Sequence, residues 1–212
     1  MSKKKCNFAP LIRTRNMRKP IGYILSLFFF FFLFLCLNGC KRASVPKPYG
    51  YVRLTMPDTC YANKVPSGYP YRFDVSCNAE VLPIRGEHGE GYWIDLHYPA
   101  LNATVHCSYQ PVQGNLRELT DDAVRFVYRH ASHASSIPER GYEHPEARVY
   151  GVLFDLEGNT ASSMQFFVTD SVRHFFRAAA YCDCVPNADS LAPIFDYLHK
   201  DVVRIVESFE WR

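Results

Sequence analysis

Cys40 is the residue whose surroundings point most directly to chemistry. It closes the run Leu37-Asn38-Gly39-Cys40, directly after an almost wholly apolar stretch, residues 21–37, that contains five consecutive phenylalanines. This ending looks like a bacterial lipobox, in which the cysteine thiol takes a diacylglycerol, the leader is cut before the cysteine, and the new amino group is acylated. The pattern therefore predicts lipid attachment at Cys40.

The residues before Cys40 are predicted to be a lipoprotein signal peptide, residues 1–39. A basic start at Arg18 and Lys19, an apolar centre and a small residue before the cut are typical of secretory signals. Met17 is an alternative start of the chain. A transmembrane anchor is the competing interpretation, but an apolar run of about 17 residues is at the short limit for crossing a bilayer. The lipobox and the polar residues that follow it favour the signal peptide.

Charge excludes one class of partner. Seven of the 24 Lys and Arg residues precede Cys40 and none of the 21 Asp and Glu residues do, so residues 40–212 carry 17 basic and 21 acidic side chains, a net charge of −4. Nucleic-acid-binding domains carry a basic patch or stripe. We therefore expect no nucleic-acid partner.

The other cysteines offer thiol chemistry or disulfides. Five of them follow Cys40, namely Cys60, Cys77, Cys107, Cys182 and Cys184. A cell-envelope compartment permits disulfides, but an odd number leaves one thiol unpaired or paired between chains. The sequence alone does not determine the disulfide pairing. On a strand, Cys182 and Cys184 would face the same side.

Histidines offer two weak metal candidates. His130 and His133 lie three residues apart on a predicted helix and share a face, whereas His97 and His106 lie on the two arms of a predicted hairpin. Neither pair has the third ligand of a zinc site. No Gly-x-Ser-x-Gly elbow and no phosphate loop occurs. We therefore predict no catalytic residue, no cofactor and no metal.

Aromatic residues are frequent, at 15% of the chain. They gather in the first half after Cys40, at Tyr61, Tyr69, Tyr71, Tyr92, Trp93, Tyr98 and Tyr109. One interpretation is a sheet core, and the other is a protein-binding surface, because Tyr and Trp are favoured anchors at interfaces.

Hydrophobic periodicity predicts the elements that position these residues. Alternation indicates strands over 49–56, 71–75, 79–84, 148–156, 161–169 and 173–182, and a hairpin with arms 92–99 and 100–109. Spacings of three and four indicate a helical segment that opens at Gly114-Asn115, has its main part capped at Thr120 and fades by Ser135–Ser136. They also indicate a last helix with Asp189 as its N-cap and Pro193 in its first turn. Residues 139–147 read as polar and flexible.

This order predicts the fold class and the domains. Strands and helices are grouped rather than alternating, which indicates an α+β fold with a mainly antiparallel sheet and two covering helices. By fold analogy the order is similar to the PsbP/Mog1-type α-β sandwich. We expect a signal peptide (1–39), a lipidated tether (40–48) and a single α+β domain (49–212).

Several long runs resemble the family of GldD, the gliding motility lipoprotein of Bacteroidetes. The similar runs are residues 47–53, the stretch Val149–Ser162 that contains VYGVLFDLEGN, residues 165–171, 174–177 and 186–193, and the final Glu210-Trp211. The resemblance covers nearly all of the chain after Cys40 and is thinner between Cys60 and Glu90.

The resemblance implies a lipid-anchored, non-enzymatic envelope component of the gliding machinery, which is tied to type IX protein secretion. Its implied partners are the membrane, through the lipid on Cys40, and other gliding or secretion proteins of the envelope. We expect it to face the periplasm, with inner and outer membrane both open. The alternative is a periplasmic enzyme or small-ligand binder that uses Cys107, Cys182, Cys184 or the His130/His133 pair.

Overall fold

The computed structural model describes residues 18–37, 56–84, 91–129, 133–185 and 187–212, in two units that are considered separately. The first unit, Met1–Gly50, contains α1 (Arg18–Leu37), a helix over the predicted signal region. Within the described residues, no helix is long and apolar enough to cross a membrane. Cys40 and the predicted tether lie outside the described residues, so their predictions stay predictions.

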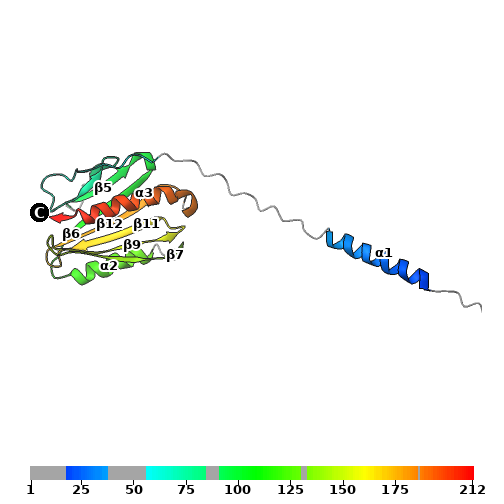
Figure 1. Ribbon diagram of the computed structural model, residues 1–212. Coiled ribbons are helices and arrows are strands. Elements are labelled where there is room, and N and C mark those ends of the chain that lie inside the picture. The colour runs from blue at the N-terminus through cyan, green and yellow to red at the C-terminus, as the bar shows by residue number, and fades with distance from the viewer. Residues whose placement is uncertain (1–17, 38–55, 85–90, 130–132, 186) are drawn as a thin grey trace, which may run out of the picture. The chain divides into compact units, whose positions relative to one another are not determined.

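The second unit, Tyr51–Arg212, is built on an antiparallel sheet of seven strands (Figure 1). In spatial order these are β4 (Glu80–Ile84), β5 (Trp93–Tyr98), β6 (Ala103–Pro111), β12 (His174–Cys182), β11 (Ser162–Thr169), β9 (Val149–Asp155) and β8 (Glu139–His144). A short 3-10 turn, η1 (Pro99–Leu101), joins β5 to β6. The two halves of the sheet meet where β12 pairs with β6.

The register of the central strands decides which side chains share a face. Ala178 of β12 lies opposite Cys107 of β6, and His106 lies opposite both Asp95 and Ala179. Because successive side chains of a strand point to opposite faces, Cys107 and Ala178 face one side and His106 and Ala179 face the other.

Helix α3 (Ala188–Glu207) packs on the first of these faces. Its apolar stripe, which includes Leu198, Val202 and Ile205, meets the inward side chains of the sheet in the larger core. An aromatic group lies at the centre of this core: the rings of Tyr71 and Phe176 have centroids 4.7 Å apart, and those of Phe176 and Phe209 are 5.1 Å apart. The side chains on this face of the sheet are therefore part of the larger core.

Helix α2 (Leu116–Arg129) covers only part of the opposite face. Its buried side chains, Leu119, Ala123 and Val127, pack against residues of β9, β11 and β12 such as Phe154, Phe167 and Phe175. The apolar cluster beneath α2 contains no described residue of β4, β5 or β6, and α2 borders only the β6 edge of that area, at Ser108 and Gln110.

Three two-stranded sheets complete the unit. They pair β1 (Tyr61–Asn63) with β3 (Asp74–Ser76), β2 (Tyr71–Arg72) with β13 (Glu210–Trp211), and β7 (Ala134–Ser136) with β10 (Glu157–Gly158). A disulfide between Cys60 and Cys77 ties the β1–β3 pair. The structure thereby resolves one pairing that the sequence left open.

The predicted fold class is confirmed, and several local predictions are wrong. Residues 139–144 form edge strand β8 rather than a flexible segment, because they add a row of backbone hydrogen bonds to β9. The α2 helix begins at Leu116, so Thr120 lies inside it and does not cap it. The predicted end of this helix at residues 135–136 is wrong as well, because Ala134–Ser136 form strand β7. The N-cap of α3 is Asn187 rather than Asp189, and Pro193 lies beyond the first turn. The predicted strand over 49–56 falls almost wholly outside the described residues.

Candidate functional site

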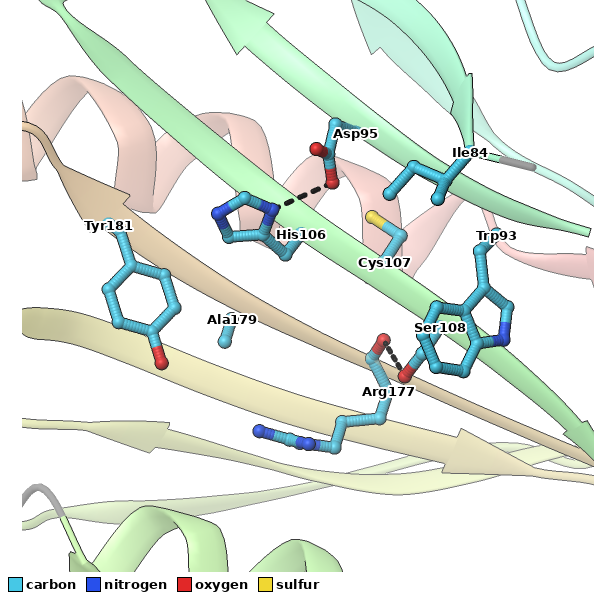
Figure 2. Close-up of a pocket in the computed structure, with 9 residues that line it drawn as sticks. All are labelled: Ile84, Trp93, Asp95, His106, Cys107, Ser108, Arg177, Ala179 and Tyr181. Atoms are coloured by element: carbon cyan, nitrogen blue, oxygen red, sulfur yellow. Dashed lines mark hydrogen bonds and ion pairs between the residues drawn. The ribbon is translucent and has the colours of Figure 1, made fainter. Parts of the chain in front are cut away.

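The uncovered part of the sheet, which we term the open face, contains a depression of about 450 Å³. Figure 2 shows the residues that line it, which come from β4, β5, β6 and β12: Ile84, Trp93, Asp95, His106, Cys107, Ser108, Arg177, Ala179 and Tyr181. The Cys107 side chain itself belongs to the larger core. Strand alternation produces this lining, since Trp93 and Asp95 point here while Ile94 and Leu96 between them enter the core. The depression has a volume within the range of small-molecule sites.

An imidazole and a carboxylate form the first polar pair of the open face. His106 Nδ1 lies 2.7 Å from Asp95 Oδ1, and the two residues are direct cross-strand partners (Figure 2). The nearby hydroxyl of Ser108 donates to the backbone oxygen of Arg177 at 3.4 Å rather than to the imidazole. These three side chains therefore do not form a Ser–His–Asp relay, in which the serine must be hydrogen-bonded to the histidine.

Arg177 is the most distinctive residue of the open face. Its guanidinium carbon lies 4.1 Å from the centre of the Phe126 ring of α2, and Nη2 donates to Gln165 Oε1 at 3.5 Å. The Nε atom is buried without a hydrogen-bond partner among the described residues. Burial lowers the pKa of Arg177, yet a guanidinium stays protonated in proteins.

No ion pair joins Arg177 to a carboxylate in the described part of the chain. A partly buried cation without a counter-charge is costly unless something pairs with it. The planar fork of arginine suits carboxylate and phosphate groups. The open face is therefore chemically suited to receive an anionic group at Arg177, beside the apolar side chains of Ile84, Trp93 and Ala179.

Tyr181 borders the same depression. Its ring centroid lies 5.5 Å from that of His106, and burial raises the pKa of its hydroxyl. It therefore remains a neutral phenol near neutral pH and adds an aromatic wall beside the imidazole.

Similarity to known proteins identifies the family. The family model described as "Gliding motility lipoprotein GldD" matches residues 41–211, which is nearly the whole chain after Cys40. The chain belongs to this family. No curated protein matches it. Among solved structures, it is similar to cyanobacterial PsbP (CyanoP) from Synechocystis, with 10% sequence identity, 78% of this chain and 99% of that chain covered, and a TM-score of 0.44.

GldD-family membership makes the chain a gliding-motility lipoprotein of the cell envelope. The structure places the cysteines of this GldD-family chain in separate regions. Cys107 is buried in the larger core, where burial raises the pKa of its thiol well above the usual value. Cys182 and Cys184 lie together at the end of β12, away from Cys60 and Cys77, which are bonded to each other.

The histidine predictions have mixed outcomes in this GldD-family chain. His97 and His106 are not cross-strand neighbours, because His97 lies opposite Thr104 and its Nδ1 is 3.2 Å from the threonine hydroxyl. His130 lies outside the described residues, so the His130/His133 pair stays a prediction. Among the side chains that are described, no three His, Cys, Asp or Glu residues are grouped to hold a metal ion.

The aromatic cluster divides between core and surface. Tyr71 and Tyr98 are fully buried and Tyr109 is nearly so, whereas Tyr92 is exposed. The core interpretation therefore holds for three of the six tyrosines, since Tyr61 and Tyr69 are only partly buried. Sequence reasoning missed Arg177, although a lone charge in the apolar run HFFRAAAY was a signal that a polar feature interrupts that face.

Proposed function

We propose that this chain is a lipid-anchored, non-enzymatic component that gliding motility or type IX protein secretion requires, and that it acts through protein–protein contacts. The observation that carries this proposal is the match to the gliding motility lipoprotein family over residues 41–211. Cys40 would carry the lipid, and the folded unit would face the periplasm. Its partners would be other envelope proteins of the gliding or secretion machinery.

The open face is the docking surface that best fits this role. It combines exposed or half-exposed apolar side chains, including Leu82 of the edge strand β4, with the unpaired Arg177. Interfaces gain most from a central anchor in a pocket, with arginine and aromatic residues enriched there. Its proposed occupant is a segment of a partner protein that places a carboxylate of Asp or Glu on Arg177, because this supplies the missing counter-charge.

The lipid anchor is tested by Cys40→Ala. We expect the wild-type chain to incorporate labelled lipid and to remain with membranes, and the variant to lose both properties because the acylated sulfur is gone. The measurements are metabolic lipid labelling and membrane fractionation. A variant that still stays integral in the membrane would show that residues 18–37 are a true membrane span, which would contradict the anchor.

The docking role is tested by Arg177→Gln in the complete lipoprotein. After crosslinking in cells, we expect recovery of gliding or secretion proteins to fall at least about tenfold, because removing one partner of a buried charge pair costs several kcal/mol. Arg117→Gln is the matched control, since Arg117 is an almost fully exposed arginine on α2. Colony spreading and secretion are measured alongside.

A second variant separates docking from folding. Leu82→Glu places a negative charge at an exposed position opposite Asp95 without removing a core side chain. We expect it to repel a carboxylate and to reduce partner recovery while the melting temperature stays close to that of the wild type. If both variants recovered gliding or secretion proteins as well as the wild type does, the docking role would be contradicted. If deleting the chain left motility and secretion intact, the function itself would fail.

The enzyme alternative in which a histidine base activates a cysteine lacks a common site, because no cysteine is hydrogen-bonded to a histidine in the described residues. Cys107 is enclosed in the core, Cys182 and Cys184 lie at the end of β12, and His106 is paired with Asp95 on the open face. An active site needs its nucleophile within hydrogen-bond reach of its base. This arrangement favours the contact role over that alternative.

A further inference from the structure

Two thiols meet at the end of the central strand β12. The sulfur atoms of Cys182 and Cys184 are 2.7 Å apart. The chain does not bring them together by strand pleating alone, because β12 ends at Cys182 and Cys184 lies two residues beyond it. Something other than sheet pairing must hold Asp183 and Cys184 in place.

Two hydrogen bonds to Asn102 hold the backbone of Asp183. The Asp183 backbone N–H donates to the Asn102 carbonyl oxygen at 2.9 Å, and the Asn102 side-chain amide donates to the Asp183 carbonyl oxygen at 2.5 Å. Asn102 itself has a left-handed backbone conformation, φ 47°, which asparagine tolerates better than most residues. The peptide between the two cysteines is thus fixed, and the thiols are held in reach of each other.

The two sulfur atoms differ in accessibility. Cys184 is exposed, whereas Cys182 is partly buried, with its sulfur 3.9 Å from the Leu101 carbonyl oxygen. Burial, followed by the neighbouring Cys184, raises the pKa of Cys182 to about 12. A protein in solution can therefore reach Cys184 first, and Cys182 is placed to react with the sulfur of Cys184.

We propose that Cys182 and Cys184 form a reversible thiol–disulfide exchange site whose substrate is a disulfide of another envelope protein. This inference goes beyond the docking function and needs only the envelope location of the family. Exposed disulfides are the readily exchanged ones, whereas enclosed structural disulfides resist reduction. A disulfide between Cys182 and the exposed Cys184 would therefore be readily exchanged.

The exchange runs through a mixed disulfide. Cys184, after losing its proton to solvent, attacks one sulfur of the substrate disulfide; that S–S bond breaks, and the leaving sulfur takes up a proton. Cys182 then loses its proton and attacks the Cys184 sulfur, which releases the second substrate thiol. In total, the pair loses two electrons and two protons to the substrate and becomes a disulfide, and the reverse sequence oxidises a substrate dithiol.

The test uses the complete lipoprotein in membranes, with glutathione as the exchanging probe. Samples equilibrated at different ratios of glutathione to glutathione disulfide are quenched with acid, free thiols are alkylated, and disulfides are then reduced and alkylated with a heavier reagent. Trypsin releases Cys182 and Cys184 on one peptide, residues 178–200, apart from the peptides of Cys60, Cys77 and Cys107. Mass spectrometry therefore reads the pair separately.

We expect the 178–200 peptide to change from the dithiol to the internal disulfide as the probe becomes oxidising, and to change back under reducing conditions. Cys182→Ser should accumulate a glutathione adduct on Cys184, because the resolving sulfur is absent. Cys184→Ser should accumulate at least about tenfold less adduct on Cys182, since reactivity follows exposure and thiolate content.

Three results would overturn the proposal. The pair stays reduced at the oxidising end, or it stays bonded at the reducing end as a permanent structural disulfide, or the two single variants form adducts equally. The outcome is independent of docking, because glutathione reacts with the pair directly and the exchange test needs no partner protein at Arg177. Loss of partner recovery with Arg177→Gln and failure of the exchange test can therefore be told apart.

Discussion

Asp201 is a carboxylate inside the core, with only 1% of its surface exposed. The Tyr61 hydroxyl donates to Asp201 Oδ1 at 2.8 Å, which links α3 to β1. Burial raises the pKa of Asp201, and its hydrogen bonds only partly offset this effect. The folded state therefore holds the Asp201 proton more readily than the unfolded chain does.

This shift predicts a pH dependence with a definite sign. The stabilisation from protonated Asp201 is full below the unfolded pKa, about 3.9, and is lost as pH rises through the raised folded pKa. We expect the stability of the wild type relative to Asp201→Asn to fall across this window, by at most about 1.4 kcal/mol per pH unit.

Thermal unfolding in detergent between about pH 4 and pH 7 measures this difference. Asp196→Asn is the control, because Asp196 is an exposed carboxylate on the same helix. If the stability of the wild type relative to Asp201→Asn grew with pH, the raised pKa of Asp201 would be contradicted.

Residue-level chemistry was only partly visible in the sequence. The predicted lipobox at Cys40 rests on a local pattern and needs no knowledge of the fold. Arg177 and Asp95, by contrast, belong to one depression only because β5, β6 and β12 align in a particular register. Arg177 lies 82 residues beyond Asp95 in the chain, so no local pattern joins them.

At the scale of elements, β9 and β11 approach unusually closely at Gly151. A Cβ atom there would lie 2.1 Å from the Phe167 backbone oxygen and 2.8 Å from Val168 Cγ1. We expect Gly151→Ala to lower the free energy of unfolding by about 1–3 kcal/mol or more, because a backbone oxygen of a paired strand cannot move aside.

Gly141→Ala on neighbouring β8 is the matched control, since a Cβ there meets nothing within 4 Å. Chemical denaturation of both variants gives the comparison. Equal effects at the two glycines would show that the close approach is not the cause.

The start of α3 offers a second test at this scale. The Asn187 side chain accepts a hydrogen bond from the Ser190 N–H at 3.2 Å. We expect Asn187→Ala to cost about 1 kcal/mol, as is typical for loss of an N-cap. Asp189→Ala should cost less, about 0.3–1 kcal/mol, because it removes only a charge near the helix N-terminus. Denaturant midpoints of the two variants decide between the observed cap and the one predicted from sequence.

Element types were predictable where periodicity was strong. The hairpin, the three strands after residue 148 and the last helix were all expected, because their apolar residues follow a clear period. Strand β8 was missed because its sequence, ERGYEH, is polar and almost wholly exposed at the sheet edge. Its strand conformation comes from backbone pairing with β9, which no side-chain pattern encodes.

At the scale of the whole molecule, the Cys60–Cys77 disulfide closes a short loop that carries β1, β2 and β3. We expect the double variant Cys60→Ser/Cys77→Ser to lose about 3 kcal/mol of stability, as a loop of this length predicts. Cys184→Ser is the control and should remain within about 0.5 kcal/mol of the wild type, because Cys184 is exposed. Thermal unfolding of both proteins, with and without reductant, is the measurement.

The α+β class followed from the order of elements, but the join between the two halves of the sheet did not. β6 and β12 pair across more than 60 residues, and they exchange hydrogen bonds from Ala103–Cys182 to Pro111–His174. Such distant pairing is specified by the combined packing of both faces. The uncovered area beside α2, and with it the open face, is a consequence of that join and was therefore not foreseen.

The pairing of β13 with β2 ties residues 209–212 to the packed core. Phe209 is fully buried against Tyr71, the Trp211 ring stacks on His174 at 5.0 Å, and the Arg212 N–H donates to the Pro70 carbonyl. Removal of residues 209–212 by a protease would therefore uncover the aromatic core. A chain clipped in this way would expose a contiguous apolar surface, and such surfaces favour aggregation.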